Sequence, residues 1–165
     1  MFDSSPSEFG NDPRAWCGRG ARWAMYLREP FSDRPLGQGE EPPLGAHIVS
    51  PRRGYLHHGI YIGRGRVVHY AGLSSGLVRG PVQAVSLSLF AGGRRISTRW
   101  SKRRSYDATE VVRRACSRLG ENRYAVLSNN CEHFCEWCLY GEARSYQIER
   151  LLAWLWPPAV ARDLS

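Results

Sequence analysis

Residues 128–141 read SNNCEHFCEWCLYG, and the rest of the chain is best interpreted around this stretch. Asn129 and Asn130 stand where a helix N-cap is favoured, and Gly141 is a typical helix stop. The residues between them have apolar members at helical spacing, namely Phe134, Cys135, Cys138 and Leu139. The pattern predicts a helix with Cys131 in its first turn.

Cys131 is a candidate nucleophile because free N–H groups and the helix dipole at that position favour a thiolate over a thiol. We therefore expect its pKa to lie below the free-thiol value of about 8.5 and its alkylation by iodoacetamide at neutral pH to be quick. The alternative is a small buried apolar residue, which is the commoner role of a single cysteine.

Length and composition indicate one folded domain. The chain has 165 residues, of which 42% are hydrophobic and 12% aromatic, as in folded globular proteins. The net charge is +8, but Lys102 is the only lysine, and so strong an arginine bias is typical of a coding preference. No arginine-rich run interleaved with aromatics is present, so we expect no nucleic-acid partner.

Five cysteines, an odd number, stand in a chain without a signal-peptide pattern. This favours free thiols in a reducing compartment, and the expected location is the cytoplasm, with a peripheral membrane contact considered below. No apolar run is long enough to span a membrane. The oligomeric state is left open.

The expected elements are those of an α+β domain preceded by a poorly structured extension over residues 1–42, which holds one short helix near 20–28 and a linker at 37–43. Strands are predicted at 45–50, where Pro51 ends the strand, and at 55–62, 66–71 and within 94–104. Residues 82–90 fit a strand or a short amphipathic turn, and 72–80 a loop. Helices are predicted at 107–119, over the cysteine stretch, and at 147–156.

The hairpin of the two central strands carries the histidines, and its register decides which of them share a face. A two-residue loop would turn His69 away from His57. A three-residue loop over 63–65, with Gly65 in the left-handed conformation, would pair His69 with Gly59 and place it on the face of His57. We favour the second register, in which Gly59 leaves room between the two rings.

This register predicts a catalytic triad. His57 would take the proton of Cys131, and His69 would bond the far nitrogen of His57 and hold its tautomer. The alternative reading is that these histidines are ordinary surface or core residues. A zinc site built from His133 and the helix cysteines at 131, 135 and 138 is a further alternative. However, only Cys135 and Cys138 have the spacing of a zinc knuckle, and both are better explained as core residues, so no metal or other cofactor is expected.

Three segments together resemble the lecithin retinol acyltransferase (LRAT) family: 55–63 (YLHHGIYIG), 67–69 (VVH) and 130–134 (NCEHF). Residues 140–145 (YGEARS), followed by Gln147, are similar to its HRAS-like suppressor branch of phospholipase A/acyltransferases. The resemblance covers roughly residues 43–150. It implies a circularly permuted papain-like fold of the NlpC/P60 type over residues 43–160, with an antiparallel sheet packed on the cysteine helix.

The resemblance also implies site roles: His57 as general base, His69 as third polar residue, Cys131 as nucleophile and Tyr55 as a helper of the oxyanion. His58 stands where the family usually has an aromatic, so it is given no catalytic role, and His133 is expected to be structural. The chain departs from the family at Ala46, where an acidic residue is common.

The implied activity is cysteine-dependent acyl transfer from lipid esters through a thioester on the enzyme. Two alternatives stay open: a thiol amidase or peptidase of the NlpC/P60 type, and a non-catalytic module that binds a lipid surface. The partner would be an acyl lipid or another acyl ester. Peripheral membrane contact is expected through residues 148–156, where aromatic and aliphatic residues follow arginines.

Overall fold

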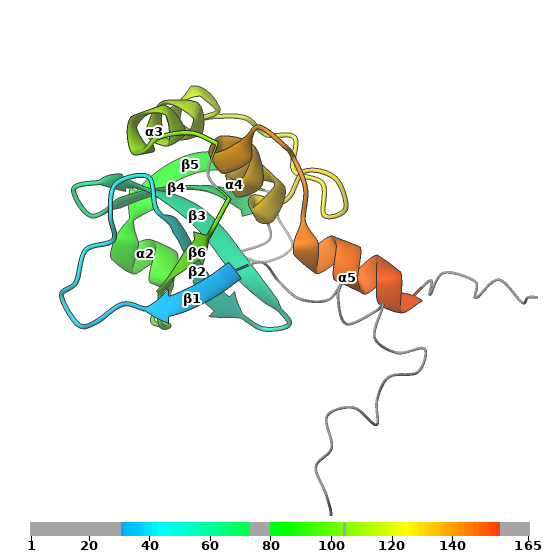
Figure 1. The fold of residues 1–165 in the computed structure, drawn as a ribbon, viewed down its shortest axis with the longest axis horizontal. Helices are drawn as coiled ribbons and strands as arrows, with labels where there is room; N and C mark the ends of the chain where they lie inside the picture. The colour runs from blue at the N-terminus through cyan, green and yellow to red at the C-terminus, as the bar shows by residue number, and fades with distance from the viewer. Residues whose placement is uncertain (1–30, 73–79, 104, 156–165) are drawn as a thin grey trace, which may run out of the picture.

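An antiparallel sheet with helices on both faces organises the chain in the computed structural model, which describes residues 31–72, 80–103 and 105–155 (Figure 1). The strand order is β1-β6-β2-β3-β4-β5. The strands are β1 (Phe31–Pro35), β2 (His47–Arg52), β3 (Tyr55–Gly63), β4 (Arg66–Gly72), β5 (Gly80–Ser86) and β6 (Ser97–Ser101). The helices are α2 (Leu87–Ala91), α3 (Ala108–Ser117), α4 (Cys131–Tyr140) and α5 (Tyr146–Leu155). The predicted α+β class is confirmed.

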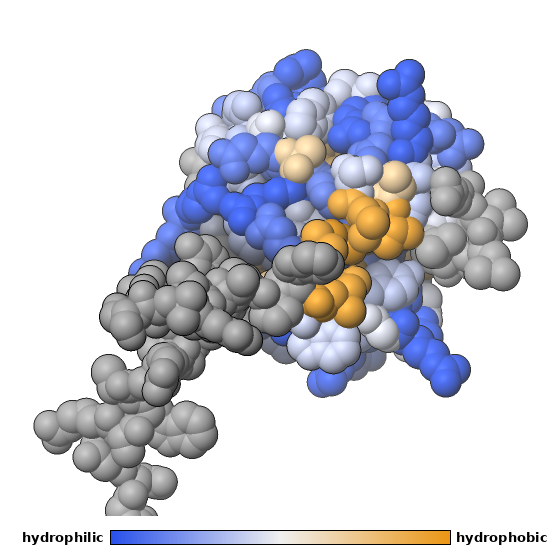
Figure 2. All heavy atoms as spheres, turned by 90° about the vertical axis from the view of Figure 1, so that its right-hand side faces the viewer, coloured by the Kyte–Doolittle hydropathy of each residue, from blue (hydrophilic) through white to orange (hydrophobic). Residues whose placement is uncertain are grey.

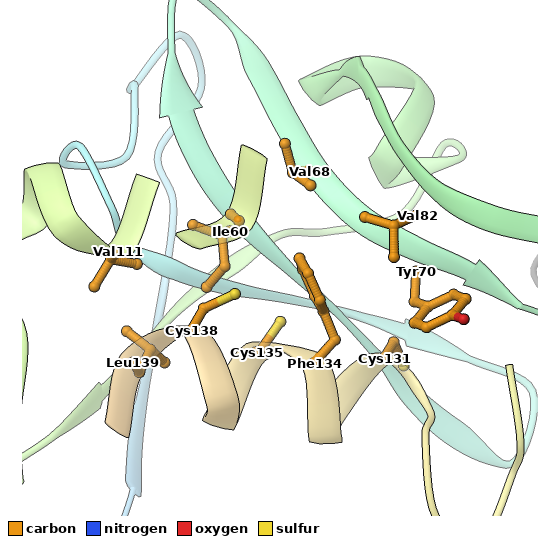
Figure 3. Packing of buried hydrophobic residues seen from close by; sticks show 11 residues of the cluster. Ile60, Val68, Tyr70, Val82, Val111, Cys131, Phe134, Cys135, Cys138 and Leu139 are labelled. Carbon is orange, nitrogen blue, oxygen red and sulfur yellow. The ribbon is translucent and has the colours of Figure 1, made fainter. Parts of the chain in front are cut away.

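The main core lies between the sheet and the helices α3 and α4. Figure 3 shows the side chains of α4 pointing toward those of the central strands. The buried residues of this core are Ile60, Val68, Tyr70, Val82, Val111, Ala115, Cys131, Phe134, Cys135, Cys138 and Leu139. Because β-strand side chains alternate between faces, the even-numbered residues of β3 point to this side, where Ile60 is buried and Ile62 packs against the core.

A smaller core fills the opposite face of the sheet, where the short helix α2 lies. Ile48, Tyr61, Val67 and Phe90 are its buried members. Ser86 caps α2 by accepting from the N–H of Leu89. The odd-numbered residues of β3 face this side, and His57 is one of them.

The hairpin of β3 and β4 has the predicted register but a different turn. Ile60 pairs with Val68, which is the register that sets His69 opposite Gly59. The loop has only two residues, Arg64 and Gly65, both with positive φ, and a bulge between Tyr61 and Gly63 shifts the register by one. The predicted three-residue loop is therefore wrong, while the face that it assigned to His69 is right.

The pairing of β3 with β4 ends at Ile60 and Val68 within the described residues. Before this point β3 continues to pair with β2, and after it β4 continues to pair with β5. The start of β3 and the end of β4 are thus held by their outer neighbours rather than by each other. The N-terminus of α4 meets the sheet at this divergence, through the contact of Cys131 with β3 described below.

Three sequence-based expectations need correction. Residues 31–35 do not belong to a poorly structured extension, because they form β1, which pairs with β6 along its whole length. Pro51 does not end β2; it lies beyond Val49, the last residue of β2 that pairs with β6, so its missing N–H breaks no ladder there. Residues 82–90 are not one strand, because β5 ends at Ser86 and α2 follows.

The other predicted elements are found with small shifts of their bounds, and Asp107 caps α3 as expected. The predicted helix near 20–28 lies outside the described residues, as does most of the predicted loop at 72–80. Among the described helices, none is both long and apolar enough to cross a membrane.

Candidate active site

Asn130 and His133 fix the start of α4 and with it the position of Cys131. The side-chain oxygen of Asn130 accepts from the N–H groups of Glu132 and His133, and Nδ1 of His133 accepts in return from the N–H of Asn130. This is a capping box that satisfies the free donors of the first turn. His133 is therefore structural in its observed contacts, and Gly141 in the left-handed conformation ends the helix as predicted.

His57 and His69 lie on the same face of the sheet and contact each other directly. Nε2 of His57 lies 2.8 Å from Nδ1 of His69, and both rings are buried. The prediction that a ring nitrogen of each would lie within hydrogen-bond distance is confirmed. Since Nε2 of His57 is engaged by His69, Nδ1 is the nitrogen left for a further proton transfer.

Phe90 of α2 supports both rings. It stacks on His57 with 5.1 Å between ring centroids and meets His69 edge-on at 5.6 Å. Gly59 makes this possible, since a Cβ there would lie 2.6 Å from a methyl carbon of Val67 and 2.9 Å from the Phe90 ring. Gly59 therefore makes room for Phe90, and not for the two imidazoles as expected from the sequence.

Cys131 is covered by its surroundings and sits against the backbone of β3. Burial raises the pKa of its thiol to about 12, while the backbone N–H of His58, and those of Cys131 and Glu132, act in the opposite direction. The expectation of a lowered pKa is thus wrong. The helix start does favour the thiolate, but its effect is smaller than the cost of removing a charged sulfur from water. The contact with the His58 amide places the thiol one residue from His57.

Tyr55 and Arg52 complete the surroundings of Cys131. Burial, and after it the charge of Cys131, raises the pKa of Tyr55. The ring of Tyr55 stands edge-on to that of His57, with 6.4 Å between the ring centroids. Arg52 donates to the carbonyls of Phe90 and Ala91 and to Ser50 Oγ. Its charge acts on Cys131, His57 and His69. The sequence predicts a role for Tyr55, whereas no sequence pattern indicates Arg52.

A second histidine pair lies on the other face of β3. Nδ1 of His58 lies 2.8 Å from Nε2 of His47, and its Nε2 lies 2.8 Å from Nε2 of Gln147. Gln147 also donates to a carboxylate oxygen of Glu132, which follows Cys131 directly. This network links β2 and β3 to the start of α5 and to the first turn of α4. No local sequence pattern indicates this network, because its members are far apart along the chain.

The remaining helix cysteines are core residues. Cys135 and Cys138 are fully buried, and burial raises the pKa of both thiols, that of Cys138 to about 12. Within the described residues, no group of His, Cys, Asp and Glu side chains is arranged to hold a metal ion. The expected burial of the two cysteines is confirmed.

The geometry defines an α+β protein in which a buried cysteine at a helix start lies against the strand that carries one member of a histidine pair. Comparison with known proteins specifies the family. The model of the lecithin retinol acyltransferase family matches residues 40–144, and the chain belongs to this family.

Several curated relatives are similar over much of their length. The chain is 34% identical over 123 residues to "Phospholipase A and acyltransferase 2" of Homo sapiens, covering 65% of this chain and 76% of the relative. It is 31% identical over 127 residues to "Phospholipase A and acyltransferase 4" of Homo sapiens, covering 67% and 77%. The match to "Lecithin retinol acyltransferase" of Mus musculus is 47% identical over 49 residues but covers only 30% of this chain and 21% of the relative.

Proposed function

We propose that the protein is an enzyme that transfers acyl groups from lipid esters through a thioester on Cys131. The names of the family and of its curated relatives support the acyl-lipid substrate class. The single observation that carries the mechanism is the bond between His57 and His69, beside the point where the backbone N–H of His58 contacts the Cys131 thiol. The fold is proposed to be the circularly permuted papain-like type, in which α4 is the catalytic helix.

The chemistry follows from two neutral groups. Burial, followed by the effects of His69 and Arg52, holds the pKa of His57 well below its usual range, and the Cys131 thiol is protonated at rest. Sγ of Cys131 forms a bond to the ester carbonyl carbon while its proton passes to Nδ1 of His57. His57 then gives that proton to the departing alcohol oxygen as the carbon–oxygen bond breaks, which leaves the thioester.

The second half of the reaction reverses these roles. His57 takes a proton from the acceptor as the acceptor attacks the thioester carbonyl carbon. The carbon–sulfur bond then breaks, and the proton on His57 passes to Sγ, which regenerates the Cys131 thiol. A water acceptor gives a phospholipase, and an amine or alcohol gives an acyltransferase. We propose that the backbone N–H groups at the start of α4 and the hydroxyl of Tyr55 stabilise the oxyanion of both steps. The positive charge of Arg52 stabilises the same negative charge as it develops.

The test is an acyl adduct. The protein is incubated with a mixed lipid extract, and peptides are examined by mass spectrometry for an acyl group on Cys131, with turnover of an activated ester measured in parallel. We expect the adduct in the wild type and in Cys116→Ser, which changes a half-buried thiol outside the site. We expect Cys131→Ser and His57→Gln to abolish measurable turnover. The loss should be no smaller than the roughly 10²–10⁴-fold that a general base typically contributes.

The outcomes separate the alternatives. Near-normal turnover of Cys131→Ser contradicts the proposal. An adduct formed only from amides or peptides supports the thiol amidase or peptidase. Lipid binding without any adduct or turnover supports a non-catalytic module that binds a lipid surface.

We further propose that α5 contacts the membrane surface from which the substrate comes. None of its described residues is buried, and its exposed apolar side chains are Leu151, Leu152, Trp154 and Leu155. Figure 2 shows apolar side chains gathered on the face of the molecule where α5 lies. Apolar side chains on a helix without a protein partner are typical of an interfacial helix. The cytoplasmic location stays a prediction.

Substitution tests this contact better than truncation, because Gln147 in the first turn of α5 hydrogen-bonds with Leu56 and Glu132. Replacing Leu151, Leu152 and Trp154 by Gln should reduce sedimentation with phosphatidylcholine–phosphatidylserine vesicles while leaving the hydrolysis of a soluble ester unchanged. Leu119→Gln, at another exposed apolar position, is the control. Unchanged vesicle binding of the triple variant would exclude α5 as the anchor.

A further inference from the structure

Gln83 lies at the end of a line of side chains that begins at His57, the base proposed for Cys131. Gln83 on β5 pairs directly with His69 on β4. Its amide nitrogen lies 3.4 Å from Nε2 of His69, and Nδ1 of His69 lies 2.8 Å from Nε2 of His57. Directly paired residues of neighbouring antiparallel strands have their side chains on the same face. The result is a line of three side chains across β3, β4 and β5.

The proton positions along this line depend on one another. A neutral imidazole has one donor and one acceptor nitrogen. If Nδ1 of His57 is to accept the thiol proton, its Nε2 must carry a hydrogen and donate it to Nδ1 of His69. His69 then carries its own hydrogen on Nε2, which faces Gln83 and requires an acceptor there.

Only one orientation of the Gln83 amide meets this requirement. With its nitrogen toward His69, Gln83 is a donor, and the line then places a hydrogen on Nδ1 of His57, where it blocks proton uptake. With its oxygen toward His69, Gln83 accepts, and Nδ1 of His57 is left free. The two orientations differ by a 180° rotation of the terminal amide, and the identity of its N and O atoms follows from the hydrogen bonds that it makes.

We propose that Gln83 is a positioning residue for the proposed reaction: its amide oxygen accepts from Nε2–H of His69 and thereby selects the tautomer in which His57 is a base. This inference rests on the function proposed for His57 and Cys131. Gln83 acts through His69 and touches no reacting atom. Sequence patterns do not reveal it, because a half-buried glutamine on an outer strand has many ordinary roles.

The test exploits two substitutions of similar size. Gln83→Glu provides a carboxylate that can only accept, and Gln83→Met provides neither donor nor acceptor. The measurement is the pH profile of kcat/KM for an activated ester, with kcat and KM also compared separately. Among the described residues, the groups that can titrate or carry charge around the dyad are Arg52 on β2, Tyr55 and His58 on β3, Arg94 after α2 and Cys131 on α4. The matched controls are Gln38→Glu and Gln38→Met, at an exposed glutamine remote from this line.

We expect Gln83→Glu to keep wild-type activity at neutral pH or exceed it, and to move the acid limb of the profile to higher pH, because a carboxylate beside His69 favours the protonated dyad. We expect Gln83→Met to lower kcat about tenfold with KM unchanged, a part of the 10²–10⁴-fold that general-base catalysis supplies. The Gln38 variants should match the wild type.

Two results would overturn the inference. One is a wild-type profile and rate for Gln83→Met. The other is an equal loss in both Gln83 variants with an unmoved acid limb and a lowered melting temperature, which would mean that Gln83 only packs. Failure of the proposed function is recognised separately, because turnover would then survive Cys131→Ser.

Discussion

Among single residues outside the proposed site, Glu136 has an unusual environment. It lies in α4 with 1% of its surface exposed, and its Oε1 has no hydrogen-bond partner among the described residues. Burial, followed by the nearby Glu132, raises the pKa of this carboxyl to about 8. The folded state therefore holds a proton on Glu136 that the unfolded chain releases above its ordinary pKa of about 4.5.

This raised pKa gives a signed prediction. The contribution of Glu136 to stability is present below pH 4.5 and is lost as the pH rises toward 8. Glu136→Gln, which cannot ionise, should leave the free energy of unfolding nearly unchanged at pH 4.5 and raise it by roughly 2–4 kcal/mol at pH 9. Chemical denaturation at both pH values measures this. The control Glu110→Gln, at a partly exposed position on α3, should show no such gain. An equal effect of Glu136→Gln at both pH values would contradict the prediction.

Among the elements, the first turn of α4 is expected to connect the stability of the helix to the proposed chemistry of Cys131. Asn130 accepts two N–H groups of that turn, and its own amide donates to the carbonyl of Val126 at 2.8 Å. Cys131 is the next residue. Loss of this cap should therefore both destabilise α4 and displace the thiol from the His58 amide.

Asn130→Ala should cost about 1–2 kcal/mol of stability and also reduce kcat/KM per folded molecule. Asp107→Ala is the matched control, because Asp107 caps α3 in the same way, by accepting from the N–H of Glu110 at 2.9 Å, away from Cys131. It should cost similar stability with no change of kcat/KM. Ester turnover and thermal unfolding of both variants decide the matter, and equal kinetics in the two would show that the cap does not position Cys131.

Parts of α4 and of the β3–β4 hairpin follow from local sequence signals. The bounds of α4 could be predicted because Asn130 and Gly141 are local signals. The shared face of His57 and His69 could be predicted because side chains alternate between the faces of a strand. A two-residue loop with one bulge gives the same register for His69 as a three-residue loop does. The type of turn could not be predicted, because the two-residue loop and the three-residue loop both use glycines.

Other features were invisible because they depend on residues far apart in the chain. β1 has a mostly exposed, polar sequence, so only its pairing with β6 reveals it. The pKa of Cys131 depends on how much of the fold covers the thiol, and the local helix start gave the wrong direction. The support of His57 by Phe90 likewise arises from packing between distant elements.

For the protein as a unit, the buried histidines should make the fold sensitive to acid. Burial is the first cause that lowers the pKa of His47, His57, His58 and His69, in the last case to about 4. The unfolded chain takes up protons at these histidines below pH 6.5, whereas the folded protein resists them. Stability from this source is thus present above pH 6.5 and is lost as the pH falls toward 4.

The lowering of the pKa of His69 alone, from 6.5 to about 4, corresponds to a loss of roughly 3 kcal/mol of stability at pH 4. We expect the melting temperature to fall between pH 7 and pH 4.5, although Glu136 acts in the opposite direction over part of this range. Measurements in the Glu136→Gln background remove that opposing effect. Replacing His47 by Leu together with His58 by Phe should flatten the curve, and a melting temperature that is constant from pH 7 to pH 4.5 would contradict the prediction.

The covered, protonated state of Cys131 also bears on how the protein tolerates oxidants. Hydrogen peroxide attacks thiolates that solvent can reach, and Cys131 is only 4% exposed with a pKa of about 12. Cys116, which is partly exposed, should be converted to the sulfenic acid or beyond before Cys131 is. Peptide mass spectrometry after graded peroxide treatment would show the order, and early loss of Cys131 would reveal a thiolate at rest. A nucleophile that ionises only when substrate arrives would remain usable in a cell under oxidative stress.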